Sequence, residues 1–205
     1  MTSDYKKVFK NPPQIETEHL ILRAMRVSDA ADMYEYASNP QTTEYLLWSP
    51  HPAQQSTAEY LRYIESLYKQ GGFYDWAVIL KSENKMIGTG GYAHVEEKHG
   101  CAEIGYVLNP AYWHKGYGTE VASELISFGF SVLGFNRIQA RYMVGNEYSR
   151  SVMEKCGMTF EGIQRQLLYV KGKFRDIGFC AILREDYFKT HEKKEYRLHW
   201  YDRLR

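Results

Sequence analysis

Three consecutive stretches of this chain have the composition of β-strands and are separated by very short connections. They run from Phe73 to Lys81, from Lys85 to Glu96 and from Cys101 to Leu108. The three and four residues between them have the length of hairpin loops, so neighbouring stretches are expected to pair antiparallel. A meander in the middle of the chain constrains the fold strongly, because the flanking segments must supply the layers that bury it.

Helical and strand-like periodicities alternate on both sides of the meander. The expected strands are Glu18–Ala24, Arg137–Val144, Met158–Val170 and Lys173–Leu183. The expected helices are Ser28–Ala37, Ser56–Gln70, Gly118–Leu133 and Glu147–Cys156. The proline-containing stretch 41–53 is expected to be a loop, and the first 14 residues are expected to be loosely held. These elements predict a mixed α/β fold with a mostly antiparallel sheet of about seven strands and about four helices.

The length of 205 residues, with no internal repeat and no Pro/Gly-rich linker, favours a single domain over residues 1–205. Its core is expected over about 15–184, followed by a C-terminal extension over 185–205. The extension carries Tyr196, Trp200 and Tyr201 among basic residues. It is either a segment packed on the core or a contact surface, and the sequence leaves both possibilities open.

Charge and cysteine content argue against several classes of function. The 26 Lys and Arg against 25 Asp and Glu give a net charge of +1, which argues against nucleic acid as the main partner. No apolar run approaches the length of a membrane span, and the first residues lack the apolar segment of a signal peptide. Cys101, Cys156 and Cys180 are an odd number without metal-ligand spacing, so we expect a cytoplasmic protein with free thiols and no metal.

The stretch from Gly105 to Glu120 carries the clearest functional signal. A strand ends near Pro110, and the turn Lys115-Gly116-Tyr117-Gly118 then opens an amphipathic helix. A helix start presents unpaired N–H groups and the positive end of the helix dipole, which suits a phosphate. Taken alone, such a turn is more often an ordinary turn than an anion site. Other phosphate and catalytic motifs are absent: a dinucleotide fingerprint would need glycine at Val121, and neither HExxH nor GxSxG occurs.

Five motifs occur in a fixed order around this turn. They are Thr17–Arg23 (TEHLILR), Glu103–Leu108 (EIGYVL), Trp113–Glu120 (WHKGYGTE), the group Asn146, Ser149, Glu154–Met158 and Glu161–Gly162, and Gly172–Asp176 (GKFRD). This series resembles the GCN5-related N-acetyltransferase superfamily (GNAT), and within it the ribosomal-protein alanine/serine N-acetyltransferases of the RimJ/RimL type. Met158 stands where that branch usually has phenylalanine. The resemblance extends from about Ile15 to Leu183.

The resemblance implies the GNAT fold, with splayed strands at the donor site, and transfer of acetyl from acetyl-CoA to an amine. Backbone amides would hold the pyrophosphate, here those of Lys115, Gly116, Tyr117, Gly118 and Thr119. The pantetheine arm would pair like an added strand where two strands splay, along Tyr106, Val107 and Leu108. Asn146 would bond the arm or the substrate side of acetyl-CoA.

Amine attack on a thioester requires a neutral amine and a site for the oxyanion. Glu103 is the candidate base, because it shares a strand face with Gly105 and lies just before the segment expected to meet the thioester. The alternative is a structural carboxylate paired with an arginine such as Arg141. For the oxyanion we expect a backbone N–H at Val107 or Leu108.

The departing thiolate also needs a proton donor. Many members of the superfamily have a tyrosine seven residues after the asparagine, but this chain has Met153 there. Ser149 is the candidate donor, and the alternatives are Tyr148, a water molecule, or departure of the thiolate without assistance. The alternative for Ser149 is a capping residue in the first turn of its helix.

The acceptor is less constrained. Five aromatic residues are expected either around the acceptor side or in the core: Tyr45, Trp48, Phe73, Tyr74 and Trp76. The role of His51 and of the loop 46–52 is undecided in the same way. A protein N-terminal α-amine is the first hypothesis, because its ordinary pKa near 8 makes deprotonation easy. A small amine, such as a polyamine, an amino sugar or an antibiotic, is the second. The third is a CoA-binding sensor without catalysis. We expect a monomer or homodimer that binds neither membranes nor nucleic acid.

Overall fold

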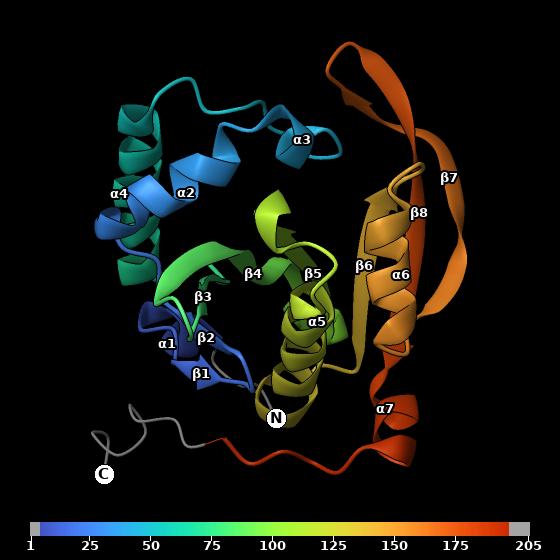
Figure 1. Cartoon of the computed structure of the whole chain (residues 1–205). Coiled ribbons are helices and arrows are strands. Elements are labelled where there is room, and N and C mark those ends of the chain that lie inside the picture. The colour runs from blue at the N-terminus through green and yellow to red at the C-terminus, as the bar shows by residue number, and fades with distance from the viewer. Residues whose placement is uncertain (1–4, 197–205) are drawn as a thin grey trace, which may run out of the picture.

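The computed structural model describes residues 5–196, and an eight-stranded sheet forms its centre (Figure 1). The strands are β1 (Ile15–Glu16), β2 (Leu20–Arg23), β3 (Asp75–Leu80), β4 (Lys85–Glu96), β5 (Cys101–Leu108), β6 (Arg137–Met143), β7 (Thr159–Val170) and β8 (Lys173–Leu183). Their order in the sheet is β1-β2-β3-β4-β5-β6-β8-β7, and every neighbouring pair is antiparallel except β5 and β6. The predicted mixed, mostly antiparallel sheet and its central meander are therefore confirmed.

The four predicted helices are all present, with small shifts at their ends. They are α2 (Ala30–Ala37), α4 (Gln54–Gln70), α5 (Tyr117–Phe128), which continues as a π-helical segment over Gly129–Leu133, and α6 (Glu147–Lys155). Gly134, in the left-handed conformation with φ of 74°, ends the π segment as expected for a glycine at a helix end.

Three short helices were not predicted: α1 (Tyr5–Lys10), α3 (Pro40–Thr43) and α7 (Arg184–Thr190). The stretch 41–53 is therefore not wholly a loop. Asn39 begins α3 by accepting a hydrogen bond from the Gln41 N–H, with proline at the first helical position. A single turn of this kind lacks the apolar period on which helix prediction depends.

The expectation that the first 14 residues are loosely held is wrong for the part that the structure describes. Val8 and Phe9 of α1 are buried, and the Phe9 ring packs edge-on against Trp76 and Tyr74. The Trp76 indole N–H donates to the Pro13 carbonyl at 2.8 Å. Two apolar residues among polar ones show no helical periodicity, so the sequence does not predict that this segment packs. The packing depends on contact with Trp76, which lies far away in the sequence.

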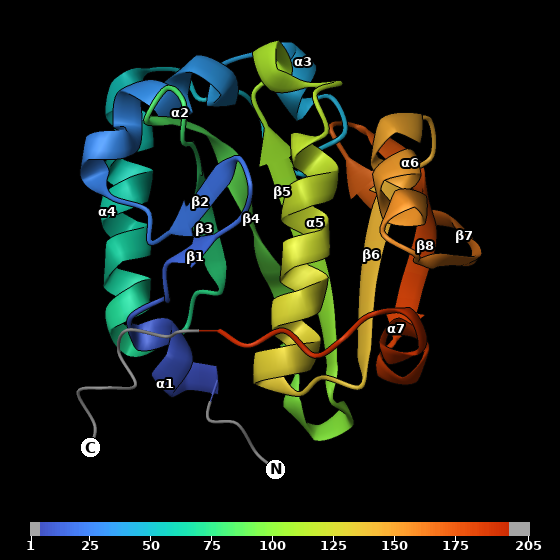
Figure 2. The ribbon, with the colours of Figure 1, turned by 60° about the horizontal axis from the view of Figure 1, so that its bottom comes forward.

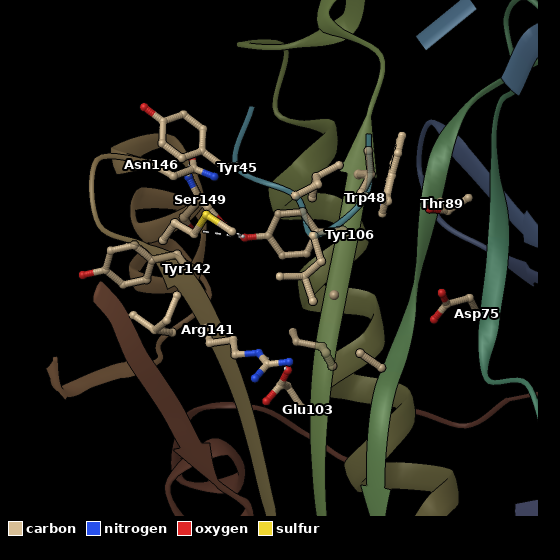
Figure 3. Close-up of a pocket in the computed structure, with 18 of the residues that line it drawn as sticks. Tyr45, Trp48, Asp75, Thr89, Glu103, Tyr106, Arg141, Tyr142, Asn146 and Ser149 are labelled. Carbon is tan, nitrogen blue, oxygen red and sulfur yellow. Dashed lines mark hydrogen bonds and ion pairs between the residues drawn. The ribbon is translucent and has the colours of Figure 1, made fainter. Parts of the chain in front are cut away.

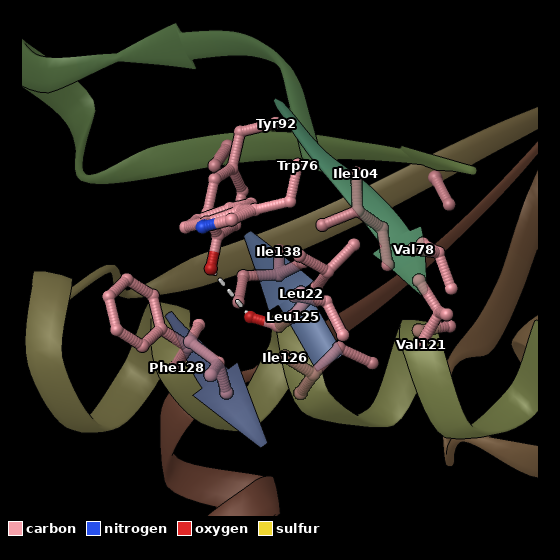
Figure 4. Close-up of a cluster of buried hydrophobic side chains, with 14 of the residues drawn as sticks. Leu22, Trp76, Val78, Tyr92, Ile104, Val121, Leu125, Ile126, Phe128 and Ile138 are labelled. Atoms are coloured by element: carbon pink, nitrogen blue, oxygen red, sulfur yellow. Dashed lines mark hydrogen bonds between the residues drawn. The ribbon is translucent and has the colours of Figure 1, made fainter. Parts of the chain in front are cut away.

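Two layers of helix cover the two faces of the sheet. On one face, α5 packs over a core that includes Trp76, Tyr92 and Phe128, and the Tyr92 hydroxyl donates to the Leu125 carbonyl at 2.6 Å (Figure 4). On the other face, α2 and α4 pack over a second core that includes Ala77 and Met86. Alternate residues of a strand face opposite sides, so Trp76 belongs to the α5 face while Asp75 and Ala77 belong to the α2/α4 face.

The C-terminal extension packs on the core as far as the structure describes it. Figure 2 shows the segment after α7 running back across α5. Lys194 Nζ lies 2.7 Å from Glu124 Oε2, and the Tyr196 hydroxyl lies 2.8 Å from Ser127 Oγ. Of the two interpretations of the extension, the packed segment holds for this part. Trp200 and Tyr201 lie outside the described residues.

Within residues 5–196, the three cysteines are unpaired thiols, and none of the helices is long and apolar enough to cross a membrane. Cys180 is buried, while Cys101 and Cys156 are partly exposed. The same residues contain no group of three or more His, Cys, Asp or Glu side chains placed to hold a metal ion.

Candidate active site

The parallel strands β5 and β6 are hydrogen-bonded only at one end. The pairing covers Cys101–Glu103 against Arg137–Gln139 and stops there, although both strands continue. On its other edge β5 remains paired with β4 as far as Leu108. The C-terminal part of β5 therefore presents an open backbone edge toward β6. This edge includes the segment Tyr106–Leu108 that is predicted to pair with the pantetheine arm.

The alternation of hydrogen bonds along β5 shows which amides face the opening. The Asn109 N–H donates to the Ile87 carbonyl at 2.8 Å, so it points toward the β4 side. In an antiparallel pair the N–H groups alternate between the two edges, so Val107 also points toward β4 while Tyr106 and Leu108 point into the opening. Of the two amides considered for the oxyanion, Leu108 fits the opening and Val107 does not.

The glycine turn lies at the start of α5. Gly116 has φ of 87°, a conformation that favours glycine, and a Cβ there would meet no atom within 4 Å. The Glu120 N–H makes the first bond of the helix, to the Gly116 carbonyl at 3.0 Å, which leaves the preceding amides without an intrahelical acceptor. Among residues 5–196, no side chain caps this end of α5. The turn is thus an open set of donors at the positive end of a twelve-residue helix.

A cavity of about 460 Å³ lies beside the strand opening (Figure 3). Its walls come from strands β3 to β8 of the sheet, from α2, α4 and α6, and from the loop between α3 and α4. The polar and ionisable residues that line it are Tyr36, Tyr45, His51, Tyr60, Asp75, Thr89, Glu103, Tyr106, Arg141, Tyr142, Asn146 and Ser149. The cavity therefore extends from the strand segment predicted to bind acetyl-CoA to the carboxylates of Asp75 and Glu103.

Glu103 lies on the cavity wall but is not a free carboxylate. Its Oε1 lies 2.8 Å from Arg141 Nε, and its Oε2 accepts a hydrogen bond from Gln139 Nε2 at 3.3 Å. Glu103 is 8% exposed, while the Arg141 side chain is about one third exposed. The ion pair named as the structural alternative for Glu103 is therefore present.

The start of α6 brings Asn146, Ser149 and Tyr106 together. Asn146 Oδ1 accepts a hydrogen bond from the Ser149 N–H at 3.2 Å, so Asn146, rather than Ser149, caps the helix. The Tyr106 ring reaches across the strand opening, with its hydroxyl 3.3 Å from Ser149 Oγ and 3.2 Å from the Ser149 carbonyl (Figure 3). Burial raises the pKa of the Tyr106 hydroxyl above its ordinary value of 10, so it stays protonated at neutral pH.

Met153 and Tyr148 differ in their surroundings. Met153 is buried and lines the cavity, and its thioether cannot donate a proton in place of the tyrosine that is usual at this position. Tyr148 is 66% exposed and its ring packs edge-on against His114, away from the cavity lining. The hydroxyl groups that the structure places at the opening are those of Tyr106 and Ser149.

The aromatic residues expected around the acceptor side divide into two groups. Tyr45 and Trp48 line the cavity with His51, whose Nδ1 lies 2.8 Å from Thr57 Oγ1. Burial lowers the pKa of His51, so this ring is neutral at neutral pH. The other three are core residues rather than lining: Phe73 packs against Tyr68, while Tyr74 and Trp76 pack around Phe9.

Asp75 is the lining residue that sequence reasoning missed. It opens β3, lies deep in the protein and is partly accessible through the cavity. Its carboxylate forms neither a hydrogen bond nor an ion pair with any of residues 5–196, and burial raises its pKa from 3.8 to about 7. The available signal was a single acid at the start of the apolar strand DWAVIL; only the packing of α4 shows that this acid is enclosed.

A mixed sheet opened between two parallel strands, beside an uncapped glycine turn and a polar cavity, has the architecture of a CoA-dependent acyltransferase. The model of the acetyltransferase (GNAT) domain family matches residues 19–159, so the chain belongs to this family and is an N-acetyltransferase enzyme. The family uses acetyl-CoA.

Individual relatives agree with this assignment. The chain is 32% identical over 172 residues to the uncharacterized N-acetyltransferase YoaA of Bacillus subtilis, covering 84% of this chain and 97% of that protein. It is 31% identical over 171 residues to the uncharacterized N-acetyltransferase p20 of Bacillus licheniformis, covering 83% of this chain and 96% of that protein. The crystal structure of a GNAT-family acetyltransferase from Bacillus anthracis superposes with a TM-score of 0.75 at 30% identity, covering 84% of this chain and 99% of that one.

Proposed function

We propose that this protein transfers acetyl from acetyl-CoA to a primary amine, and that the acceptor is the α-amine of a protein N-terminus, as in the RimJ/RimL branch. The observation that carries the proposal is the strand opening between β5 and β6 next to the open amides of the glycine turn. A diphosphate and a long amide-bearing arm need these two features side by side.

The backbone of Lys115–Thr119 supplies the donors for the diphosphate, and the Lys115 side chain adds a positive charge. The amides of Tyr106 and Leu108 face the opening and pair with the amide-bearing arm. Bound acetyl-CoA would supply a thioester carbonyl, and the Leu108 N–H would stabilise the charge that develops on its oxygen. Asn146 would lie beside the arm, because its cap position fixes its amide at the cavity wall.

Glu103 is the base that the sequence proposes. Both of its oxygens already have partners, Arg141 and Gln139, so it would have to give up one of them to accept a proton from the acceptor. Replacement of Glu103 by glutamine tests the role: a base predicts a fall in kcat of roughly 10²- to 10⁴-fold that partly recovers at high pH.

Ser149 and Tyr106 together are the proposed donors to the departing thiolate. The two hydroxyls lie 3.3 Å apart at the strand opening, and the tyrosine is protonated at neutral pH. A hydrogen bond from Tyr106 to the sulfur would stabilise the thiolate, with Ser149 orienting the phenol. This pair takes the place of the tyrosine that Met153 replaces.

Two relatives illustrate the choice of acceptor. The Escherichia coli ribosomal protein uS5 alanine N-acetyltransferase is 24% identical over 187 residues, and the Vibrio cholerae spermidine N(1)-acetyltransferase is 22% identical over 177 residues. A small amine such as a polyamine is the second candidate, because a 460 Å³ cavity with two carboxylates also suits a short polycation.

The experiment is the release of free thiol from acetyl-CoA in the presence of alanine- and serine-terminated peptides, spermidine and an aminoglycoside. The proposal expects release with at least one amine, and the fastest release with a peptide. Thiol release only with spermidine or the aminoglycoside would overturn the peptide acceptor. Binding of acetyl-CoA without release in any case would indicate a sensor module.

A further inference from the structure

Asp75 lies on the face of the sheet that α2 and α4 cover, in line with two glycines. In the strand register, Asp75 pairs with Gly91 on β4, and Gly91 pairs with Gly105 on β5. Directly opposed residues present their side chains to the same face, so one row of the sheet carries a carboxylate followed by two positions without side chains. The row ends at β5, beside the strand opening.

The carboxylate leans along this row. A Cβ built on Gly91 would come within 2.1 Å of Asp75 Oδ1 and within 2.3 Å of both Asp75 Cα and the Tyr74 carbonyl oxygen, so the Asp75 carboxylate and the β3 backbone together fill the space beside Gly91. A Cβ on Gly105 would meet only Ala93, at 3.8 Å, so the space above Gly105 is open. Neighbouring strands lie about 4.8 Å apart, so the backbones of Asp75 and Gly105, which are two strands apart, are separated by roughly 10 Å. The Asp75 carboxylate covers part of this span over Gly91, so a group bound above Gly105 on its β4 side would lie between the carboxylate and the strand opening.

The surroundings of Asp75 contain no described cation that pairs with it. The titratable groups that line the same cavity or pack against Asp75 are Tyr36 of α2, Tyr60 and Tyr68 of α4, His51 of the loop after α3, Glu103 with Arg141 across the sheet, and Tyr45, Tyr106 and Tyr142. Burial raises the pKa of Tyr36, Tyr60 and Tyr68, that of Tyr60 to about 12, so these three hydroxyls are neutral. Arg141, the cation on the cavity wall, is engaged by Glu103.

We infer that Asp75 binds the ammonium group of the acceptor above Gly105 and accepts its proton, while Glu103 serves as the fixed partner of Arg141. This inference rests on the proposed amine acetyltransferase function and adds to it the residue that selects the amine. The aromatic rings of Tyr36, Trp48 and Tyr60 would surround the carbon atoms next to the nitrogen.

The proton and electron balance of the step is simple. An acceptor that arrives as R–NH₃⁺ gives one proton to the Asp75 carboxylate, and the freed lone pair forms the N–C bond to the acetyl carbon. The C–S bond breaks, the sulfur keeps the bonding pair, and it takes the second amine proton through the hydroxyls at the opening or through water. Asp75 then releases its proton to water.

The pKa of Asp75, about 7, suits an α-amine. The ordinary pKa of an α-amine is near 8 and that of a lysine-like alkylamine is near 10.4. Proton transfer to Asp75 is therefore close to balanced for the first and clearly uphill for the second. This difference favours a peptide N-terminus over a polyamine as the acceptor.

The test compares Asp75→Asn with Glu103→Gln, and with Asp186→Asn as a carboxylate control on the exposed surface of α7. Asparagine has the shape of aspartate and removes only the charge, so the variant should fold. The measurements are kcat/KM for the alanine- and serine-terminated peptides and for spermidine between about pH 5.5 and 9, and calorimetric binding of the same amines with CoA present.

Asp75→Asn is expected to lower kcat/KM for the acceptor by roughly 100-fold or more, and to lack the rise in kcat/KM near pH 7 that is expected of the wild type. Amine binding should weaken at least tenfold, and Glu103→Gln should lose clearly less on both readouts. The inference is overturned if Asp75→Asn stays within threefold of the wild type while Glu103→Gln falls 100-fold, or if the wild type binds none of the amines. Amine binding through Asp75 without thiol release would leave the amine-binding role of Asp75 standing, and would remove the proposed function together with the proton transfer.

Discussion

The donor side and the acceptor side of this site are built from different parts of the polypeptide. The donor side consists largely of backbone: the open amides at the start of α5 and the unpaired edge of β5. The acceptor side consists of side chains from α2, α4, β3 and the loop after α3, which meet only in the folded protein. Backbone sites follow from glycine placement and strand order, whereas a side-chain cavity follows from tertiary packing.

The largest effect is expected on the donor side, from Gly116→Val. A β-branched residue is strained at φ of 87°, and its side chain covers the amides. Loss of two hydrogen bonds to a charged group, about 1.5 kcal/mol each, weakens acetyl-CoA binding about 100-fold. The rise in Tm that saturating acetyl-CoA produces in the wild type should disappear.

Gly134→Val is the matched control for this variant. Gly134 has a similar φ of 74° but ends the π segment after α5, remote from the turn. It should lower Tm through comparable backbone strain while keeping the acetyl-CoA shift. An acetyl-CoA shift retained in Gly116→Val would remove the turn from the donor site.

The next effect concerns the boundary between the two sides. Tyr106→Phe removes the hydroxyl at the strand opening and is expected to lower kcat roughly 10- to 100-fold, with little change in acetyl-CoA affinity. Ser149→Ala should cost less, under about tenfold, because Ser149 acts through Tyr106 and the cap on α6 comes from Asn146. A larger loss in Ser149→Ala than in Tyr106→Phe would make the serine the direct donor.

A third effect distinguishes the acceptor side through stability rather than turnover. Burial raises the pKa of Asp75 in the folded protein from 3.8 to about 7. Between these two pH values the folded protein keeps the Asp75 proton while the unfolded chain has lost it, so the free energy of unfolding falls as the pH rises through this range. Asp75→Asn removes this penalty. The variant should melt higher than the wild type near pH 8, and the difference should vanish near pH 4.

A bound ammonium provides a check on this effect. Ammonium favours the ionised carboxylate, so an acceptor amine should raise the Tm of the wild type more than that of Asp75→Asn near pH 8. Equal melting of the two proteins at both pH values without ligand would show that Asp75 is already compensated in the folded state.

The smallest effect is expected from Gly105→Ala. The added methyl group would meet only Ala93 at an ordinary contact distance, so Tm should hardly change. The methyl does, however, occupy the floor on which the amine is proposed to lie. We expect a few-fold rise in the KM of the acceptor and an unchanged affinity for acetyl-CoA. Equal changes in both would mean that Gly105 serves the donor side.

The contrast between backbone and side chains also explains how much the sequence could predict. The meander and the glycine turn at Gly116 follow from local patterns, and the structure confirms the predicted mixed, mostly antiparallel fold. The Glu103–Arg141 pair was foreseen only as an alternative, since β5 and β6 had to be placed next to each other first. Asp75 could not be predicted as a site residue, because nothing local distinguishes an enclosed acid from an exposed one at the start of a strand.

The central claim is that the donor side binds acetyl-CoA and the acceptor side binds the amine. It is tested most directly by measuring the interaction with each substrate in one variant of each side. The quantities are the Kd of acetyl-CoA by calorimetry and kcat/KM for the acceptor amine, in Gly116→Val and in Asp75→Asn. The account predicts that Gly116→Val raises the Kd about 100-fold, whereas Asp75→Asn leaves it within threefold and lowers kcat/KM for the amine by roughly 100-fold. An Asp75→Asn protein that weakens acetyl-CoA binding as much as Gly116→Val, or that acetylates the amine at the wild-type rate, would contradict it.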